Sequence, residues 1–148
     1  MAFHFALDPL LRLRQSVERQ RSLLLQEATL QLRRAEEELA RFEQFLTDSA
    51  LADFAGLAAG CSGAELHFAH LYGEQLQTFR LQLQNEVERS KAVRQQVLTA
   101  YQQAVREREL LETLRSSQHR AYRLEQSRQQ QQELDTNFLL RSCQRREG

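Results

Sequence analysis

His67 and His70 form the residue pair whose types and spacing come nearest to a metal site in this sequence. They are three positions apart and therefore share one face of a helix, and Glu74 follows one turn later. With Cys61 nearby, the group offers ligand types that Zn²⁺ accepts. The sequence has no second ligand pair with the spacing of a zinc finger. We therefore expect ordinary histidines and no bound metal.

Other residue types that support catalysis lack the necessary arrangement. Glu36, Glu37 and Glu38 are consecutive, so in a helix their carboxylates point to different sides and cannot act as a pair. A glycine-rich phosphate loop followed by Lys, a G-x-S-x-G motif and a Cys–His nucleophile pair are all missing from the sequence. The prediction is that the chain is not an enzyme, has no catalytic residues and binds no cofactor.

Six aromatic residues gather around the middle of the chain. Three precede a glycine-rich stretch and three follow it: Phe42, Phe45, Phe54, Phe68, Tyr72 and Phe79. A contact between two helices uses only part of such a cluster, so the remainder is a candidate partner-binding patch.

The composition favours long helices over a globular core. The 148 residues are 41% hydrophobic and 27% charged, with one Pro and no Trp. Most apolar residues are single Leu, Ala or Val among Glu, Arg and Gln, which is typical of helices with a narrow apolar seam. No segment predicts a strand.

The first predicted helix begins at Asp8 and ends at about residue 54. Asp8 can accept a hydrogen bond from an early backbone N–H, and Pro9 at the first helical position loses none. Apolar or small residues then recur every three or four positions, with Arg21 as an interruption, and so predict a seam. The seam residues are Leu10, Leu13, Val17, Leu24, Ala28, Leu32, Ala35, Leu39, Phe42 and Leu46.

A turn is predicted at about residues 55–62, because three of the five glycines cluster there. Ser62 and Glu65 match the S-x-x-E capping box that starts a helix. The glycines expected to release the chain from the first helix are Gly56, Gly60 and Gly63.

The second helix is predicted over about residues 63–140. Its seam residues are Leu66, Ala69, Leu76, Phe79, Leu83, Val87, Val93, Val97, Ala100, Ala104, Leu111, Leu114 and Ala121. Since neither helix is stable alone, we expect an all-α fold, a two-helix antiparallel coiled-coil hairpin with a longer C-terminal helix, as a single domain over residues 1–148.

The two predicted helices are unequal in length. With the turn centred at residue 59, Phe3 lies near residue 114 or 115, and residues from about 118 to 140 have no partner in the first helix. At 1.5 Å per residue this overhang is about 35 Å long. It is polar and becomes apolar at residues 138–140, so it is expected to seek a partner surface.

The total charge is zero, with 20 Lys or Arg and 20 Asp or Glu, but the charges are unevenly distributed. Residues 1–34 hold six Arg and three acids, residues 35–114 seven bases and thirteen acids, and residues 115–148 seven Arg and four acids. A hairpin would combine the two ends into a basic pole of net +6, opposite an acidic turn. Overall neutrality argues against a nucleic-acid partner.

The sequence also predicts a soluble cytoplasmic protein. Cys61 and Cys143 are too few for a disulfide framework and read as free thiols. The N-terminal residues lack the basic region of a secretory signal, and no uncharged run is longer than that of residues 54–64, which is shorter than the ~20 residues needed to span a bilayer.

Four stretches together resemble the FliJ family of flagellar export proteins. They are FHFALDPLLRLR at residues 3–14, AEEEL at 35–39, GAELHFAHLYGEQL at 63–76 and QELD at 132–135. Their order and spacing and the unequal helices agree with the family over nearly the whole chain. The resemblance implies an antiparallel coiled coil similar to the central stalk of rotary F-type ATPases.

The resemblance also implies partners and a location. Such a stalk binds the hexameric flagellar export ATPase ring, couples it to the export-gate membrane protein and escorts export chaperones. It would lie at the cytoplasmic face of the inner membrane, at the flagellar base, and associate with the membrane only through its partners.

Two sets of binding positions follow from the resemblance. The positions implied for the ATPase ring are Phe3, Phe5, Leu7, Leu10, Arg12, Arg14, Leu134, Asp135 and Phe138. Those implied for the export gate are Glu38, Phe42, Phe45, Tyr72, Leu76, Phe79 and Leu83. Ser49 stands where the family usually has an aromatic residue, and Thr136 replaces a common acid.

Other interpretations remain open at this point. A stalk protein of a virulence-type secretion system would have the same shape and class of partner, and its neighbouring genes would distinguish it. A generic coiled-coil scaffold or an Arg-rich nucleic-acid-associated coiled coil is a further alternative, and a salt-sensitive shift of duplex DNA would favour the latter.

Overall fold

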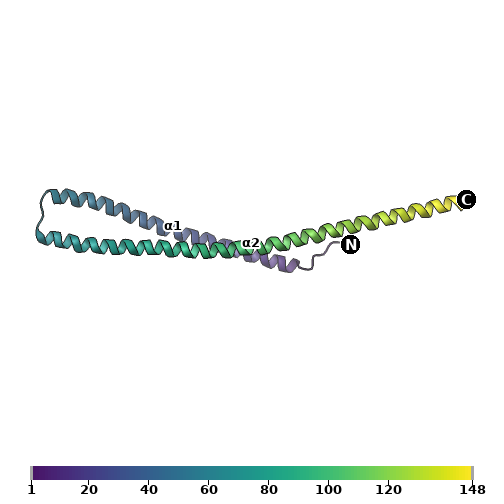
Figure 1. Ribbon diagram of the computed structural model, residues 1–148, viewed down its shortest axis with the longest axis horizontal. Coiled ribbons are helices and arrows are strands. Elements are labelled where there is room, and N and C mark those ends of the chain that lie inside the picture. Colours follow the sequence, from purple (N-terminus) through teal and green to yellow (C-terminus); the bar gives the residue numbers. More distant parts are fainter. Residues whose placement is uncertain (1, 148) are drawn as a thin grey trace. The chain divides into compact units, whose positions relative to one another are not determined.

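The structure is a computed structural model that describes residues 2–147. Within that range it consists of two helices and contains no strand (Figure 1). Helix α1 spans Asp8–Ala58, with 51 residues, and α2 spans Gly63–Glu147, with 85 residues. The chain reverses between them, so that α1 and α2 run antiparallel. The all-α helical hairpin with a longer second helix is therefore confirmed.

Both helices extend further than the sequence patterns indicated. Helix α1 continues to Ala58 instead of about residue 54, and α2 continues to Glu147 instead of about residue 140. Gly56 lies inside α1, because a helix tolerates a glycine at a cost of about 1 kcal/mol. Among the described residues Gly60 is the one with positive φ, at 93°, so this glycine reverses the chain.

The start of α2 has the predicted capping box. The backbone N–H of Ser62 donates to Oε2 of Glu65 at 2.7 Å, and the backbone N–H of Glu65 donates to Oγ of Ser62 at 3.3 Å. These two bonds satisfy groups that a helix start otherwise leaves without partners. The pair therefore fixes the residue at which the helix resumes.

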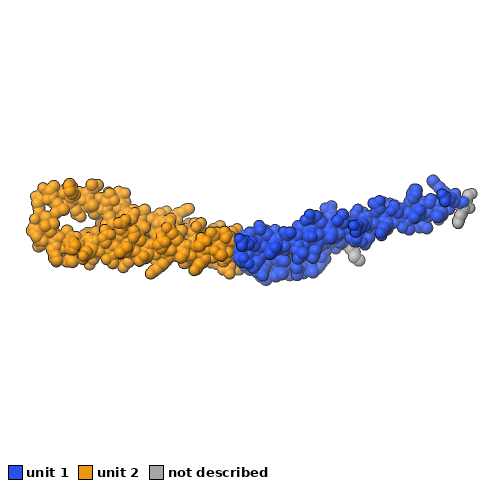
Figure 2. Space-filling view, viewed as in Figure 1, with its two compact units in different colours: residues 1–18, 103–148 blue, residues 19–102 orange. Residues whose placement is uncertain are grey.

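The chain divides into two compact units (Figure 2). Unit 1 comprises residues 1–18 and 103–148, which are the start of α1 and the C-terminal part of α2. Unit 2 comprises residues 19–102, which are the rest of α1, the turn and the start of α2. That the chain acts as a single domain over residues 1–148 stays a prediction.

The core of unit 1 lies between the N-terminal residues and α2. Its buried side chains are Phe5, Leu11 and Ala104, each at most 4% exposed. The ring of Phe3 contacts those of His119 and Tyr122, with centroids 4.9 and 5.6 Å apart.

This contact corrects the predicted position of Phe3 near residue 114 or 115. Phe3 reaches further along α2 for two reasons. Helix α1 runs on to Ala58 before the turn, and the residues around Phe3 are not helical. An extended residue advances about 3.3 Å, whereas a helical residue advances 1.5 Å.

The core of unit 2 is thin and built from small side chains. Ala28 and Ala35 of α1 and Val87 of α2 are its buried residues, at 6–8% exposed. Small side chains allow the two helices to approach closely, but they remove little apolar area from water.

Part of the predicted seam of α1 is wrong, because the helix buries a neighbouring stripe. Leu11 is 2% exposed and Leu25 is half-buried, and the half-buried Ser22 replaces Arg21 in the seam. Because leucines occur at adjacent positions, two neighbouring faces of α1 both fit helical spacing. The sequence pattern alone therefore does not determine which face is buried. The predicted seam residues of α1 that lie exposed are Leu10, Leu13 and Leu24.

The predicted seam of α2 is also wrong in part, because the buried stripe follows a strict seven-residue repeat from Gly73 to Leu111. That repeat places Arg80, Arg94 and Arg108 at seam positions, which a pattern of apolar residues alone does not indicate. The predicted seam residues of α2 that lie exposed are Leu66, Ala69, Phe79, Val93, Leu114 and Ala121.

We predict opposite effects for alanine at two glycines near the turn. Gly60→Ala forces a side chain into the left-handed region and lowers the free energy of unfolding by about 1–2 kcal/mol. Gly56→Ala is the matched control: it lies in α1 with open space around an added Cβ, and it raises stability by about 0.5–1 kcal/mol. Urea unfolding followed by circular dichroism measures both changes. Shifts in the same direction would contradict the assignment of the reversal to Gly60.

Candidate functional site

The N-terminal residues implied to bind the ATPase ring lie along α2 in unit 1. Phe5 is 3% exposed and holds the segment to the core, and Phe3 packs on aromatic rings of α2. Leu7 and Leu10 are 38% and 37% exposed and therefore reach the surface. Of these four apolar side chains, Leu7 and Leu10 are the ones a partner can contact without displacing the core.

The two arginines of this segment form ion pairs within unit 1. Arg12 Nη2 lies 3.0 Å from Asp8 Oδ2, and Arg115 Nη1 lies 3.9 Å from Asp8 Oδ1. Arg14 pairs across the two helices with Glu107. Arg14 thus helps to hold the helices together, and its charge is not free for a partner.

The charge of unit 1 is smaller than predicted for the basic pole. The unit holds eleven Lys or Arg and nine Asp or Glu, a net charge of +2 instead of +6. Residues 19–34, with four arginines and one glutamate, belong to unit 2, which removes a net charge of +3, and residues 103–114, with two arginines and three glutamates, add a net charge of −1 to unit 1. These four are Arg19, Arg21, Arg33 and Arg34.

The C-terminal stretch of α2, residues 123–146, presents nearly all of its side chains to solvent. Gln126 and Ser142 are half-buried and the others are exposed, including Asp135. Figure 1 shows α2 continuing past the N-terminal segment within this unit. The large apolar residues of the stretch are Leu124, Leu134, Phe138, Leu139 and Leu140, at 58–72% exposed.

The ring-binding set therefore forms two separate patches in unit 1. Leu134 lies twelve residues beyond Tyr122, which is about 18 Å along a helix. The structure brings Leu134, Asp135 and Phe138 together on α2, and it does not bring them to the N-terminal residues.

Two seam arginines of unit 2 reach across to α1. Arg80 Nη2 donates to Glu43 Oε1 at 3.1 Å, and Arg94 Nε donates to Thr29 Oγ1 at 3.4 Å. The aliphatic part of each side chain covers the seam while the guanidinium finds a polar partner at its edge. These arginines are fourteen residues apart, which is two seven-residue repeats, and that period is the sequence signal by which they could have been found.

The third arginine of this series, Arg108, lies in unit 1. It donates from Nε to Glu18 of α1 and from Nη1 to Glu112 Oε2 at 2.6 Å. Hydrogen bonds to Glu18 and Glu112 raise the pKa of Arg108 above its ordinary value. A raised pKa contributes stability that is present below the ordinary value and lost only above it, so this group adds no pH dependence near neutrality.

We predict that Arg108→Glu lowers the melting temperature of the chain, because it places a carboxylate against Glu18 and Glu112. The matched control is Arg89→Glu, whose guanidinium lies 3.9 Å from Glu86 on one exposed helix face and contributes little. Adding Glu18→Arg to Arg108→Glu restores part of the loss. Thermal unfolding by circular dichroism measures all four chains, and equal melting temperatures for Arg108→Glu and Arg89→Glu would contradict the pairing.

Near the turn, unit 2 contains a cluster of aromatic side chains that closes the two helices on each other. The ring of Phe42 meets that of Phe79 edge to face, with centroids 4.9 Å apart, and stacks on Phe45 at 6.1 Å. Phe68 and Tyr72 stack on each other further towards the turn, at 6.4 Å. The cluster thus divides into a closing group and an exposed group.

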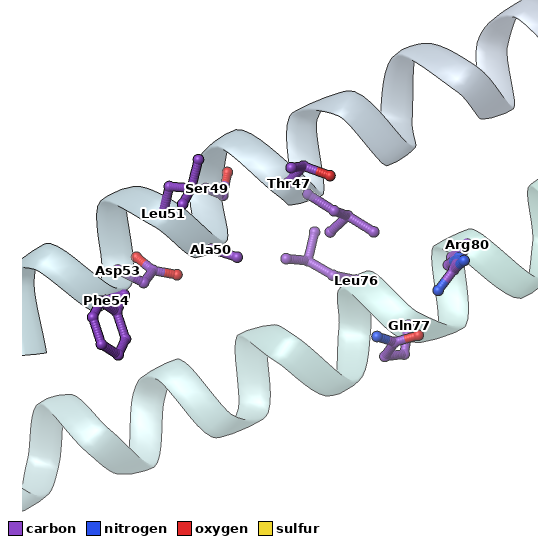
Figure 3. Close-up of a pocket in the computed structure, with 10 residues that line it drawn as sticks. Thr47, Ser49, Ala50, Leu51, Asp53, Phe54, Leu76, Gln77 and Arg80 are labelled. Atoms are coloured by element: carbon purple, nitrogen blue, oxygen red, sulfur yellow. The ribbon is translucent and has the colours of Figure 1, made fainter.

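Between this closing group and the turn, the helices of unit 2 lie apart. Every side chain in residues 50–72 is exposed. An open cavity of about 680 Å³ separates α1 from α2 there, with Leu46, Ala50 and Phe54 on one side and Leu76 on the other (Figure 3). The space-filling view shows the same end of unit 2 opened (Figure 2).

The seam residues explain why the helices separate. Continuing the repeat of α1 beyond Leu46 gives Ser49, Asp53 and Gly56, and α2 offers Gly73 opposite them. These side chains are too small or too polar to hold two helices together. Leu66 continues the repeat of α2 back from Gly73 and is nevertheless 50% exposed. Other large apolar residues lie off the seam: Leu51, Phe54, Leu57, Phe68, Leu71 and Tyr72, at 45–77% exposed. We call these six residues the turn surface.

The residues implied for the export gate divide between surface and seam. Glu38, Phe45, Tyr72 and Phe79 are exposed, the three aromatic ones at 45–47%. The half-buried members, which contribute to the contact between α1 and α2, are Phe42, Leu76 and Leu83. The structure thus places all seven in unit 2, and the role of each stays a prediction.

The His, Cys and Glu residues considered as metal ligands do not come together into one site. His70 Nε2 is 3.4 Å from Glu74 Oε1 on the exposed face of α2, and Cys61 and Cys143 are exposed free thiols. Across the described range no group of three or more His, Cys, Asp or Glu is placed to hold a metal ion. None of the helical segments in residues 2–147 is both long and apolar enough to cross a membrane.

These features define a class of protein: a helical hairpin with exposed large apolar side chains in each of its units. The family comparison gives the particular group. The model of the flagellar FliJ protein family matches residues 3–148, and the chain belongs to this family. Comparisons with curated proteins and with solved structures returned no match. The chain is accordingly a flagellar export-related protein, as the resemblance indicated.

Proposed function

We propose that this chain is a non-catalytic, stalk-like component of flagellar type III protein export. It binds the hexameric export ATPase ring, couples the ring to the export gate in the membrane and escorts export chaperones. Family membership over residues 3–148 supports the export role. The description of that family as flagellar favours this function over a virulence-type stalk.

The C-terminal stretch of α2 is the observation that carries the ATPase proposal. A helix that buries no face is stabilised by a partner, and here Leu134 and Phe138 are 69% and 72% exposed. The two residues are four positions apart, so they form one apolar stripe that a partner groove can accept. Insertion of this stretch into the ATPase ring would bury the stripe.

The exposed aromatic residues near the turn support contact with the export gate. Phe45, Tyr72 and Phe79 are each close to half exposed, although aromatic side chains are strong contributors to interfaces. They belong to unit 2, whereas the ATPase contact is assigned to unit 1. Separate surfaces for two partners are what a coupling component requires.

A pull-down with the export ATPase, combined with the ATPase rate at increasing concentrations of the chain, tests the first contact. We expect binding and stimulation of the wild type. We expect Phe138→Glu to weaken binding by about tenfold or more, because a charge replaces an apolar anchor. Leu110→Glu is the control, since Leu110 is 71% exposed on α2 in the same unit and is outside the proposed site. If the wild type neither binds the ATPase nor stimulates it, the proposal is wrong.

The second contact is tested with the cytoplasmic part of the export-gate protein. Phe45→Asp and Tyr72→Asp should each reduce its capture by the immobilised chain, since each puts a charge into an apolar contact. Leu81→Asp serves as control, because Leu81 is 58% exposed on α2 outside the proposed contact. Capture that is unaffected by the first two substitutions would exclude this surface as the gate contact.

A further inference from the structure

We propose that the turn surface of unit 2 binds the basic C-terminal end of α2 of a second copy of this chain. The proposal goes beyond the proposed function, because it concerns association of the chain with itself. It rests on two surfaces that are both exposed within the chain and that carry opposite charge.

The acidic side of this contact is the end of unit 2 near the turn. Residues 42–79 contain five Asp or Glu and no Lys or Arg. Asp53 lines the open cavity beside Phe54, which is 77% exposed. Asp48 lies five residues earlier on α1, where its Oδ1 accepts a hydrogen bond from Gln44 at 3.0 Å. Of the five acids, Glu43 pairs with Arg80 and Glu74 lies 3.4 Å from His70, so the carboxylates that occur together with the exposed rings are those of Asp48 and Asp53.

The basic side is the end of α2. Residues 136–147 contain three Arg and one Glu. Leu134, Phe138, Arg141 and Arg145 follow at steps of four, three and four, so they share one helix face. Phe138, Arg141 and Arg145 line the same surface hollow. This face combines apolar anchors with positive charge.

The two surfaces are complementary in chemistry, and the basic helix end is long enough to cover the acidic one. Residues 50–58, where α1 stands away from α2, extend about 12 Å, and residues 134–145 extend about 17 Å. The helix end of one copy can thus lie along the opened helices of another, where Phe138 meets the exposed rings and the arginines face Asp48 and Asp53. Burial of the apolar side chains supplies the affinity, and the opposite charges set the orientation and make the contact sensitive to salt.

The full-length chain alone, without the ATPase, provides the test by sedimentation equilibrium at about 5–500 μM. We expect association in 50 mM salt that weakens about tenfold in 500 mM salt, because the screening length falls from about 14 to about 4 Å. A chain that stays monomeric throughout, or an association that salt does not weaken, overturns the proposal. Failure here leaves the ATPase and gate assays unaffected, so the two outcomes are separable.

Charge reversal identifies the surfaces. Asp48→Arg with Asp53→Arg, and separately Arg141→Glu with Arg145→Glu, should each weaken self-association about tenfold. A 1:1 mixture of these two double variants should recover association, because the unchanged basic end of one variant can meet the unchanged acidic turn surface of the other. A single chain with all four substitutions should recover it as well, since both signs are exchanged. Glu86→Arg with Glu88→Arg, at two exposed positions of α2 elsewhere in unit 2, is the matched control and keeps wild-type association.

Circular dichroism confirms that each variant retains its helices, so that loss of association is not loss of folding. Association that persists in both double variants, or a fourfold variant that does not recover, would show that other residues make the contact and would overturn the proposal. Equal weakening by the control pair would attribute the effect to net charge and would overturn it as well.

Discussion

The narrow apolar seam between α1 and α2 is the constraint on which the rest of this structure depends. Its buried residues include three alanines, Ala28, Ala35 and Ala104, so each turn of helix removes little apolar area from water. Long helices of this composition are not stable singly, and a thin seam leaves them only modestly bound to each other. Polar bonds at the seam edge, such as that of Arg80 with Glu43, accordingly contribute a larger fraction of the stability of the helix pair than they would beside a thick core.

The same constraint accounts for the surfaces assigned to partners. Where the seam of unit 2 carries Asp53 and Gly56, the helices separate and their large apolar side chains face solvent. In unit 1, α2 continues beyond the N-terminal segment, and Phe138 has nothing of α1 to pack against. The surfaces proposed to bind partners are thus places where a seam ends or loses its apolar residues.

Much of the fold could be predicted because it depends on local chemistry. The reversal at Gly60 and the capping box of Ser62 and Glu65 require only neighbouring residues, and both are present. The candidate binding surfaces were harder to predict from the sequence. Phe5 belongs to a family motif yet is buried, and its position depends on residues of α2 that are about a hundred positions away in the chain. A motif identifies such a residue without indicating whether its side chain faces a partner or the core.

The sequence by itself determined that the chain forms two unequal helices with one reversal, because helix propensity, capping and glycine conformation act within a few residues. Only the tertiary structure decided which stripe of each helix is buried. Leu10 and Leu11 are equally apolar, and helical spacing accepts either, but packing against α2 buries Leu11. It also decided that Arg108 lies in the seam, since Glu18 of the opposite helix supplies the partner that makes an arginine acceptable there.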